Sequence, residues 1–147
     1  MIRSAIRAIV DAIVRAIVPS ETGAAAVERI TNGGFDSGTS WTITGAKWSI
    51  AAGVASELGT GNGLNQTFAQ SIPSGTDYAF SVTVGGTCQG LTIALTSGGV
   101  VTDTIFSGIP VFATVNVSDT TTASADGIRF LTTSAGSTTL DDVSLIA

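Results

Sequence analysis

The sequence lacks histidine altogether and contains a single cysteine, Cys88, in 147 residues. Without histidine, neither a Ser-His-Asp nor a Cys-His catalytic unit can be built from this chain. One cysteine also excludes an internal disulfide and a cysteine-based zinc site. We therefore expect Cys88 to be a small buried hydrophobe in the region 82–92, and we do not expect an enzyme.

Charge is scarce as well, because only 12% of the residues are charged and the net charge is −5. Residues 1–18 hold three arginines and one aspartate, or +2, which leaves −7 for the remainder. Lys47 is the only lysine, and Arg29 and Arg129 are far apart in the sequence. No basic patch for a phosphate backbone is present, so nucleic acid is not an expected partner.

Two further patterns that could carry catalysis have simpler explanations. Glu57 with Asp77 or Asp103 could be imagined as a glycosidase pair, but nothing in their spacing singles them out. We expect these three acids to lie in solvated loops. The glycine-rich run 59–63 has no lysine after it and is flanked by strand-like residues, which predicts a hairpin turn instead of a phosphate loop.

The first eighteen residues predict an amphipathic helix, with residues 1–19 as its unit and 20–29 as a linker. Five isoleucines fall within an arc of about 80°, while charged residues occupy the opposite side. Pro19 ends the pattern. The isoleucine seam consists of Ile2, Ile6, Ile9, Ile13 and Ile17. The charges at Asp11 and Arg15 interrupt the apolar run, so we expect neither a signal peptide nor a membrane-spanning segment.

The 4-3-4 spacing of the first four isoleucines matches alternating heptad positions, and isoleucine at both favours three or more strands. An isolated helix of this length is marginal in water. We expect it to anchor or trimerise the protein through identical copies or a larger particle. Packing on its own β domain and binding to a lipid surface are the alternatives.

After the linker the apolar period changes to two, and short strands alternate with Gly/Ser/Asn/Asp turns. Eight or nine strands without helical pattern indicate an all-β, two-sheet antiparallel sandwich over residues 30–147. The expected strands are 41–43, 48–50, 78–84, 91–95, 100–105, 113–117, 127–132 and 140–145. The expected core contains Trp41, Ile43, Trp48, Phe80, Val82, Ile93, Leu95, Phe130 and Val143.

Two short motifs enclose this β-rich part. Asn32-Gly33-Gly34-Phe35-Asp36 with Trp41 opens it, and Leu140-Asp141-Asp142-Val143-Ser144-Leu145 closes it. Together they resemble the β-jelly-roll carbohydrate-binding modules, which occur in polysaccharide-degrading enzymes and in phage adhesion proteins. The resemblance implies a jelly roll and a structural calcium held by Asp36 and Asp141, with Asp142 as the adjacent alternative. Simple capping of turns by these acids is the other interpretation.

The same resemblance implies a glycan site, built from an aromatic ring and side-chain amides. Candidate rings are Trp41, Trp48, Tyr78 and Phe112, but both tryptophans precede an isoleucine at i+2 and are expected in the core. The predicted glycan contacts are Asn62, Asn65, Gln66, Tyr78 and Gln89.

These observations predict a non-enzymatic appendage on the surface of a phage-like virion, either a head fibre or decoration protein or a tail adhesin. The jelly-roll head would bind host surface glycans, and the helix would contact identical copies, as a homotrimer, and other virion proteins. The alternative is a stand-alone, lectin-like carbohydrate-binding module.

Overall fold

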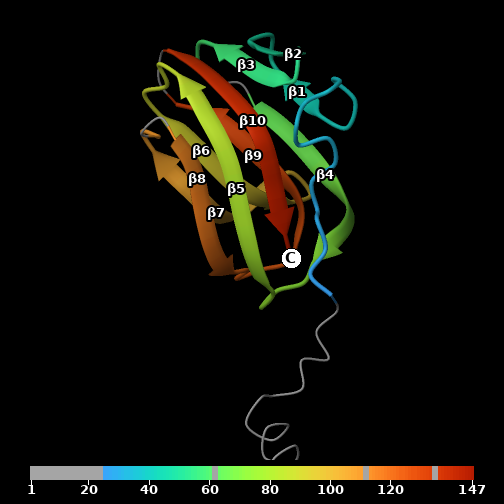
Figure 1. Ribbon diagram of the computed structural model, residues 1–147. Helices are drawn as coiled ribbons and strands as arrows, with labels where there is room; N and C mark the ends of the chain where they lie inside the picture. Colours follow the sequence, from blue (N-terminus) through green and yellow to red (C-terminus); the bar gives the residue numbers. More distant parts are fainter. Residues whose placement is uncertain (1–24, 61–62, 111–112, 134–135) are drawn as a thin grey trace, which may run out of the picture.

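The computed structural model describes residues 25–60, 63–110, 113–133 and 136–147. This part of the chain folds into two antiparallel five-stranded sheets packed face to face, which confirms the predicted all-β sandwich (Figure 1). The predicted helix over residues 1–19 and its isoleucine seam lie outside the described residues. Within the described part, no helix is long and apolar enough to cross a membrane.

One sheet has the order β1-β4-β9-β6-β7 and the other the order β2-β3-β10-β5-β8. Every named pairing is antiparallel, and strands that follow one another in sequence often belong to opposite sheets. The strands are β1 (Thr42–Thr44), β2 (Trp48–Ala51), β3 (Val54–Leu58), β4 (Gly63–Ile72), β5 (Asp77–Gly86), β6 (Leu91–Ser97), β7 (Val100–Gly108), β8 (Ala113–Thr120), β9 (Ala125–Thr132) and β10 (Ser137–Ile146).

All eight predicted strands are present, and β3 and β4 are additional. Strand β4 was difficult to predict because its sequence, GLNQTFAQSI, is rich in polar residues. Strand β3 carries Glu57, which lies in register with Trp48 on one side and Thr138 on the other. Glu57 is only 2% exposed, so the prediction of a solvated loop acid is wrong at this position. Its strand follows the same inward alternation that buries Ala55.

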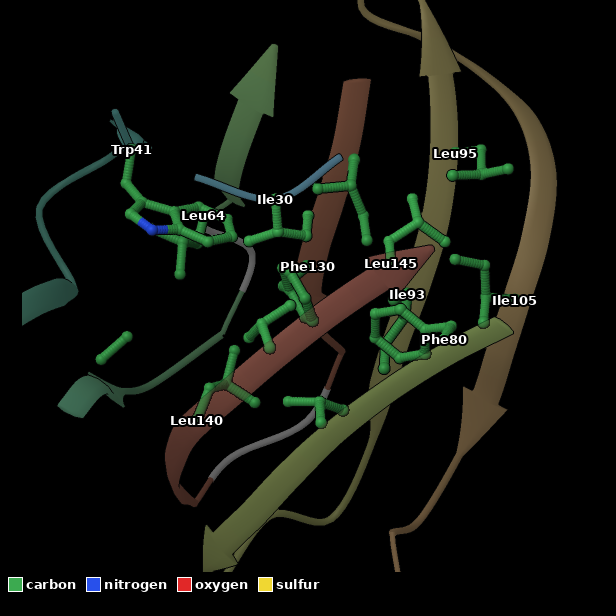
Figure 2. Packing of buried hydrophobic residues seen from close by; sticks show 14 of the residues in the cluster. Ile30, Trp41, Leu64, Phe80, Ile93, Leu95, Ile105, Phe130, Leu140 and Leu145 are labelled. Carbon is green, nitrogen blue, oxygen red and sulfur yellow. The ribbon is translucent and has the colours of Figure 1, made fainter. Parts of the chain in front are cut away.

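The core lies between the sheets (Figure 2). It contains eight of the nine residues that the sequence predicted. The exception is Ile43, which is 39% exposed. It lies on β1, a three-residue edge strand that pairs only with β4, so no second neighbour covers it. Cys88 is buried and free, as predicted.

Both tryptophans are buried, as the isoleucine pattern predicted. The Trp41 ring lies 5.0 Å from the ring of Phe35 and 6.0 Å from that of Phe130, in tilted geometry. Its indole nitrogen Nε1 donates a hydrogen bond to the Asn32 carbonyl oxygen at 3.0 Å. Trp41 therefore links the opening motif to the core and offers no exposed face to a ligand.

The opening and closing motifs lie side by side. The Val143 amide donates to the Gly33 carbonyl oxygen at 3.0 Å. A Cβ atom at Gly33 would lie 1.9 Å from the Val143 carbonyl oxygen, so only glycine fits there. The pairing of β10 with β5 has a bulge between Asp141 and Ser144, and Asp142 has a φ of 50°. The bulge bends the closing strand where the opening turn meets it.

Residues that the sequence analysis assigned to the linker pair with the end of β10. Val27 and Ala147 exchange two backbone hydrogen bonds, of 2.9 and 3.0 Å. The Glu28 carboxylate accepts from the amides of Ile30 and Leu145, at 2.9 and 2.8 Å. In Figure 1 this blue segment runs up beside the end of the chain, marked C.

Candidate functional site

The outer face of the β1-β4-β9-β6-β7 sheet carries a row of polar and small side chains. Leu64, Phe130 and Ile93 are in register on neighbouring strands and are fully buried on the inner face. Because side chains alternate along a strand, the next row points outward. That outer row consists of Thr42, Asn65, Arg129, Ala94 and Thr104, in the order of the strands β1, β4, β9, β6 and β7.

Arg129 lies at the centre of this row, on the central strand β9. Its Nε atom donates to Asn65 Oδ1 at 3.0 Å, and its Nη2 atom donates to the Gly99 carbonyl oxygen at 3.1 Å. Asn65 in turn donates from Nδ2 to Thr44 Oγ1 at 3.0 Å. The guanidinium is therefore held from two sides, and its plane is fixed across the face of the sheet.

Some of the positions next to Arg129 carry small residues. Ala94 is its partner on β6, and Gly127 lies two residues before it on β9, while Gly63 on β4 is paired with Leu131, two residues after it. A Cβ atom at Gly127 would lie 2.6 Å from the Gln66 carbonyl oxygen and 2.9 Å from Thr96 Oγ1. Gly127 therefore allows β9 to pack closely against β4 and β6, and Gly63 is the glycine that lines the hollow beside Arg129.

That space is an open groove, which we call the Arg129 groove. One hollow of about 230 Å³ and an adjoining one of about 170 Å³ share Thr44 and Arg129 as lining residues. The remaining lining residues are Thr42, Gly63, Asn65, Gln66, Thr67, Thr96, Gly99, Asp126 and Leu131. Both hollows are smaller than closed small-molecule sites, at about 300–1,000 Å³, so the groove suits a ligand that lies partly in solvent.

The groove offers hydroxyl, amide, carboxylate and guanidinium groups within one surface. Asp126 accepts two hydrogen bonds from the Gly98 amide, at 2.9 and 3.1 Å, and this contact fixes the β6–β7 turn at the end of the groove. Val101 lies next to Thr96 in the ladder and is exposed, which adds an apolar contact at the rim. Chemically, the groove can donate to and accept from several ligand hydroxyls at once.

Of the predicted glycan contacts, Asn65 and Gln66 line the Arg129 groove, whereas Tyr78 and Gln89 lie elsewhere. Gln66 is buried and its amide binds the backbone of Thr31 on both sides, with Oε1 accepting at 2.8 Å and Nε2 donating at 2.7 Å. The Gln66 side chain therefore holds the Thr31 backbone in place and has a structural role. Gln89 is exposed in the turn after β5 and donates to the Thr87 carbonyl oxygen. Asn62 and Phe112 lie outside the described residues.

Tyr78 lies on β5 of the opposite sheet and is buried. Burial raises the pKa of its phenol above the usual value, and the carboxylates of Asp119 and Asp103 raise this pKa further. The ring belongs to the core cluster, so it is not available as a stacking surface.

Sequence reasoning missed Arg129 as a site residue. The sequence does contain an indication of its position. Arg129 lies between the apolar residues Ile128 and Phe130 in a predicted strand, so its side chain is expected on the outer face of the sheet. A lone cation on the outer face of a central strand marks a polar surface, but its neighbours Asn65 and Gly99 become visible only once the strands are paired.

A second hollow of about 310 Å³ lies on the other sheet. Its lining residues are Lys47, Ser49, Ser56, Glu57, Leu58, Ser137, Thr138 and Thr139. It contains an exposed lysine and a large exposed apolar side chain, Leu58, but no amide side chain.

The predicted calcium ligands lie in the two adjacent motifs. Asp36 is exposed, and Asp141 Oδ1 accepts a hydrogen bond from the Asp142 amide at 2.8 Å. In the described ranges, no three acidic, histidine or cysteine side chains gather as a metal cluster. Calcium takes six to eight oxygen ligands, so backbone carbonyls would have to supply most of them. Calcium at Asp36 and Asp141 stays a prediction.

The fold is the β-sandwich of the carbohydrate-binding modules, as comparison with solved structures shows. A family 29 module, CBM29-2, matches with a TM-score of 0.58 and 11% identity, over 82% of this chain and 84% of that one. The N-terminal cellulose-binding domain of Cellulomonas fimi β-1,4-glucanase C matches with a TM-score of 0.56 and 22% identity, over 81% and 96%.

The enzymatically active domain of tailspike protein 4 from bacteriophage CBA120 also matches, with a TM-score of 0.55 and 16% identity. The match covers 81% of this chain but only 21% of the tailspike chain. Comparison with family models and with curated proteins found no match.

Proposed function

We propose that this domain binds a glycan, without catalysis, in the Arg129 groove. The observation that carries the proposal is the convergence of Arg129, Asn65 and several threonines around one groove. Sugar hydroxyls both donate and accept hydrogen bonds, and these groups supply both functions. The likeness to carbohydrate-binding modules supports the same class of ligand. The lack of histidine supports a non-catalytic role.

Binding by one groove is expected to be weak. No tryptophan, tyrosine or phenylalanine lines the groove among the described residues, so the stacking that strengthens many sugar sites is missing. Hydrogen bonds that replace bonds to water contribute only about 0.5–1.5 kcal/mol each. A few such bonds give selectivity for shape more than high affinity.

The test is binding to a panel of soluble polysaccharides, including β-glucan, xylan and mannan, by affinity electrophoresis and calorimetry. Asn65→Ala should weaken binding, because it removes the acceptor of Arg129 Nε and opens the groove wall. Asn116→Ala is the matched control, since Asn116 is exposed on β8 of the opposite sheet.

Loss of binding in Asn65→Ala with retention in Asn116→Ala supports the groove. Loss in Lys47→Gln instead would move the site to the second hollow. Absence of binding to any polysaccharide by the wild-type protein would refute the proposal.

The wider proposal is a multivalent appendage on the surface of a phage-like virion, whose residues 1–19 anchor or trimerise it. The isoleucine spacing and the likeness to a phage tailspike domain support this setting. Several weak heads tethered together raise avidity by about 10²–10⁴ without any new contact. A monomeric, lectin-like module is the alternative, and molecular mass in solution separates the two.

A further inference from the structure

Resting on the proposed function, we propose that the Arg129 groove selects acidic glycans, and that Arg129 binds the carboxylate of a uronic acid or a similar sugar acid. The inference starts from the charge balance at the guanidinium. Arg129 forms no ion pair with a carboxylate of the described residues. Its two hydrogen-bond acceptors, Asn65 Oδ1 and the Gly99 carbonyl oxygen, are both neutral.

The one acid that lines the groove, Asp126, forms no ion pair with Arg129. Both carboxylate oxygens of Asp126 accept from the Gly98 amide, which directs them to the turn after β6. The guanidinium therefore lies half-buried with no carboxylate paired to it among the described residues. A partly desolvated cation interacts more strongly with an incoming anion than an exposed one does, because the local dielectric is lower.

The geometry of the guanidinium favours a planar acid. Nε and Nη2 are fixed by the protein, while Nη1 donates to no acceptor among the described residues. The remaining N–H groups form a fork that matches a carboxylate, and such charge-assisted bonds are about twice as strong as neutral ones. Ala94, the partner of Arg129 on β6, carries only a methyl group, and the hollow beside Arg129 is lined by Thr44, Gly63 and Leu131.

The negative net charge of the protein helps to distinguish binding at this site from general ion exchange. A net charge of −5 repels polyanions at long range. A protein with this charge does not retain an acidic polysaccharide by general ion exchange. Retention of such a polymer would thus report a local site, and Arg129 is the cation that lines the groove.

The experiment compares three uronate polymers, polygalacturonate, alginate and hyaluronate, with their methyl esters, which keep the sugars and lose the charge. At about 0.15 M salt, the wild-type protein should bind at least one acid form about tenfold or more tightly than its ester. Arg129→Gln should abolish this preference. Asn65→Asp should also abolish this preference, because the introduced carboxylate would form an ion pair with the Arg129 guanidinium.

Asn116→Asp and Lys47→Gln are the controls for added negative charge and for lost positive charge, and both should keep the preference. Thermal melts of all variants should confirm that each one is folded. Dextran sulfate tests whether the ligand group is a sulfate and not a carboxylate. If Arg129-dependent retention occurs with this polymer alone, the assignment to a carboxylate is overturned.

Equal binding of acids and esters, weakened in both by Arg129→Gln, would overturn the acid selectivity and leave glycan binding intact. A preference that survives Arg129→Gln would also overturn it. Failure to bind any acidic or neutral polysaccharide would refute both proposals together.

Discussion

Asn65 and Arg129 are direct partners in the β4–β9 ladder, and their side chains meet through a hydrogen bond of 3.0 Å from Nε to Oδ1. The bond crosses the outer face of the sheet, where no core packing holds either side chain. It converts two flexible polar residues into one oriented pair. The function that we propose depends on this pair more than on any aromatic ring.

Gly33→Ala should destabilise the fold by about 1–3 kcal/mol. The new methyl group would lie 1.9 Å from the Val143 carbonyl oxygen and would force the opening turn away from β10. Gly34→Ala is the matched control, since nothing lies within 4 Å of its Cβ position, and it should change stability by about 0.5 kcal/mol or less. Urea unfolding measures both. Equal stability of the two variants would contradict the close approach of the two motifs.

Gln66→Ala should cost about 1–3 kcal/mol, because the Thr31 amide and carbonyl oxygen would both lose their partner. Gln66→Glu should be at least as harmful, since a carboxylate cannot donate to the Thr31 carbonyl oxygen. Gln89→Ala removes a comparable side chain from an exposed turn and should be nearly neutral. Denaturant midpoints at constant m-value decide the comparison.

Stability should fall in alkaline solution through Tyr78. Its pKa is raised in the folded state, so folding favours the protonated phenol. The contribution is complete below the unfolded pKa of about 10 and is lost as the pH rises through the folded pKa. Tyr78 is the only tyrosine, so its absorbance titration is unambiguous. Tyr78→Phe should flatten the alkaline fall in unfolding free energy, and an ordinary phenol pKa in the native protein would contradict this account.

Replacement of Ile9 and Ile13 by aspartate should convert the assembled protein to monomers, or release it from its particle, while the β domain stays folded. The reason is that two charges on the isoleucine seam cannot be buried between helices without large cost. Sedimentation or light scattering measures the mass, which should drop to one third for a trimer. Replacing Arg3 and Arg7 by glutamine, on the opposite face, is the control. An unchanged mass in the aspartate variant would mean that the seam makes no intermolecular contact.

A chelator should lower the melting temperature if calcium joins Asp36 and Asp141. Calcium at 100 times its Kd would stabilise the fold by about 2.7 kcal/mol. Asp141→Asn should remove the effect of the chelator, and Asp77→Asn, at a site away from the two motifs, should not. An identical melt with and without chelator would leave capping of turns as the role of these acids.

The alternation of apolar residues was sufficient to predict the sandwich and the burial of both tryptophans, because burial of one strand face is a local property of the sequence. The same rule could have identified Glu57, which has the inward parity of Ala55. Edge position could not be predicted, and Ile43 is exposed for that reason.

The groove is harder to predict because it depends on strand pairing. Asn65 and Arg129 are 64 positions apart in sequence and become neighbours only through the register of β4 on β9. The side chain of Gln66, adjacent in sequence to Asn65, points to the other face of the sheet. It forms two hydrogen bonds with the Thr31 backbone. Both residues line the groove, but the Asn65 side chain binds Arg129 while the Gln66 side chain binds the Thr31 backbone, and amide composition alone does not reveal this difference.

The pairing of residues 27–29 with the end of β10 has a mechanical consequence. If the head is held by its ligand and pulled through the segment that precedes Val27, the load passes first to this pairing. Antiparallel hydrogen bonds run perpendicular to the strands, so a pull along the segment shears them together and does not open them one by one. The Glu28 carboxylate accepts from the Leu145 amide, and the Arg29 guanidinium donates to the Ala147 carbonyl oxygen. Both contacts share that load. If the domain is displayed as we propose, this pairing would resist tension along the segment that precedes Val27.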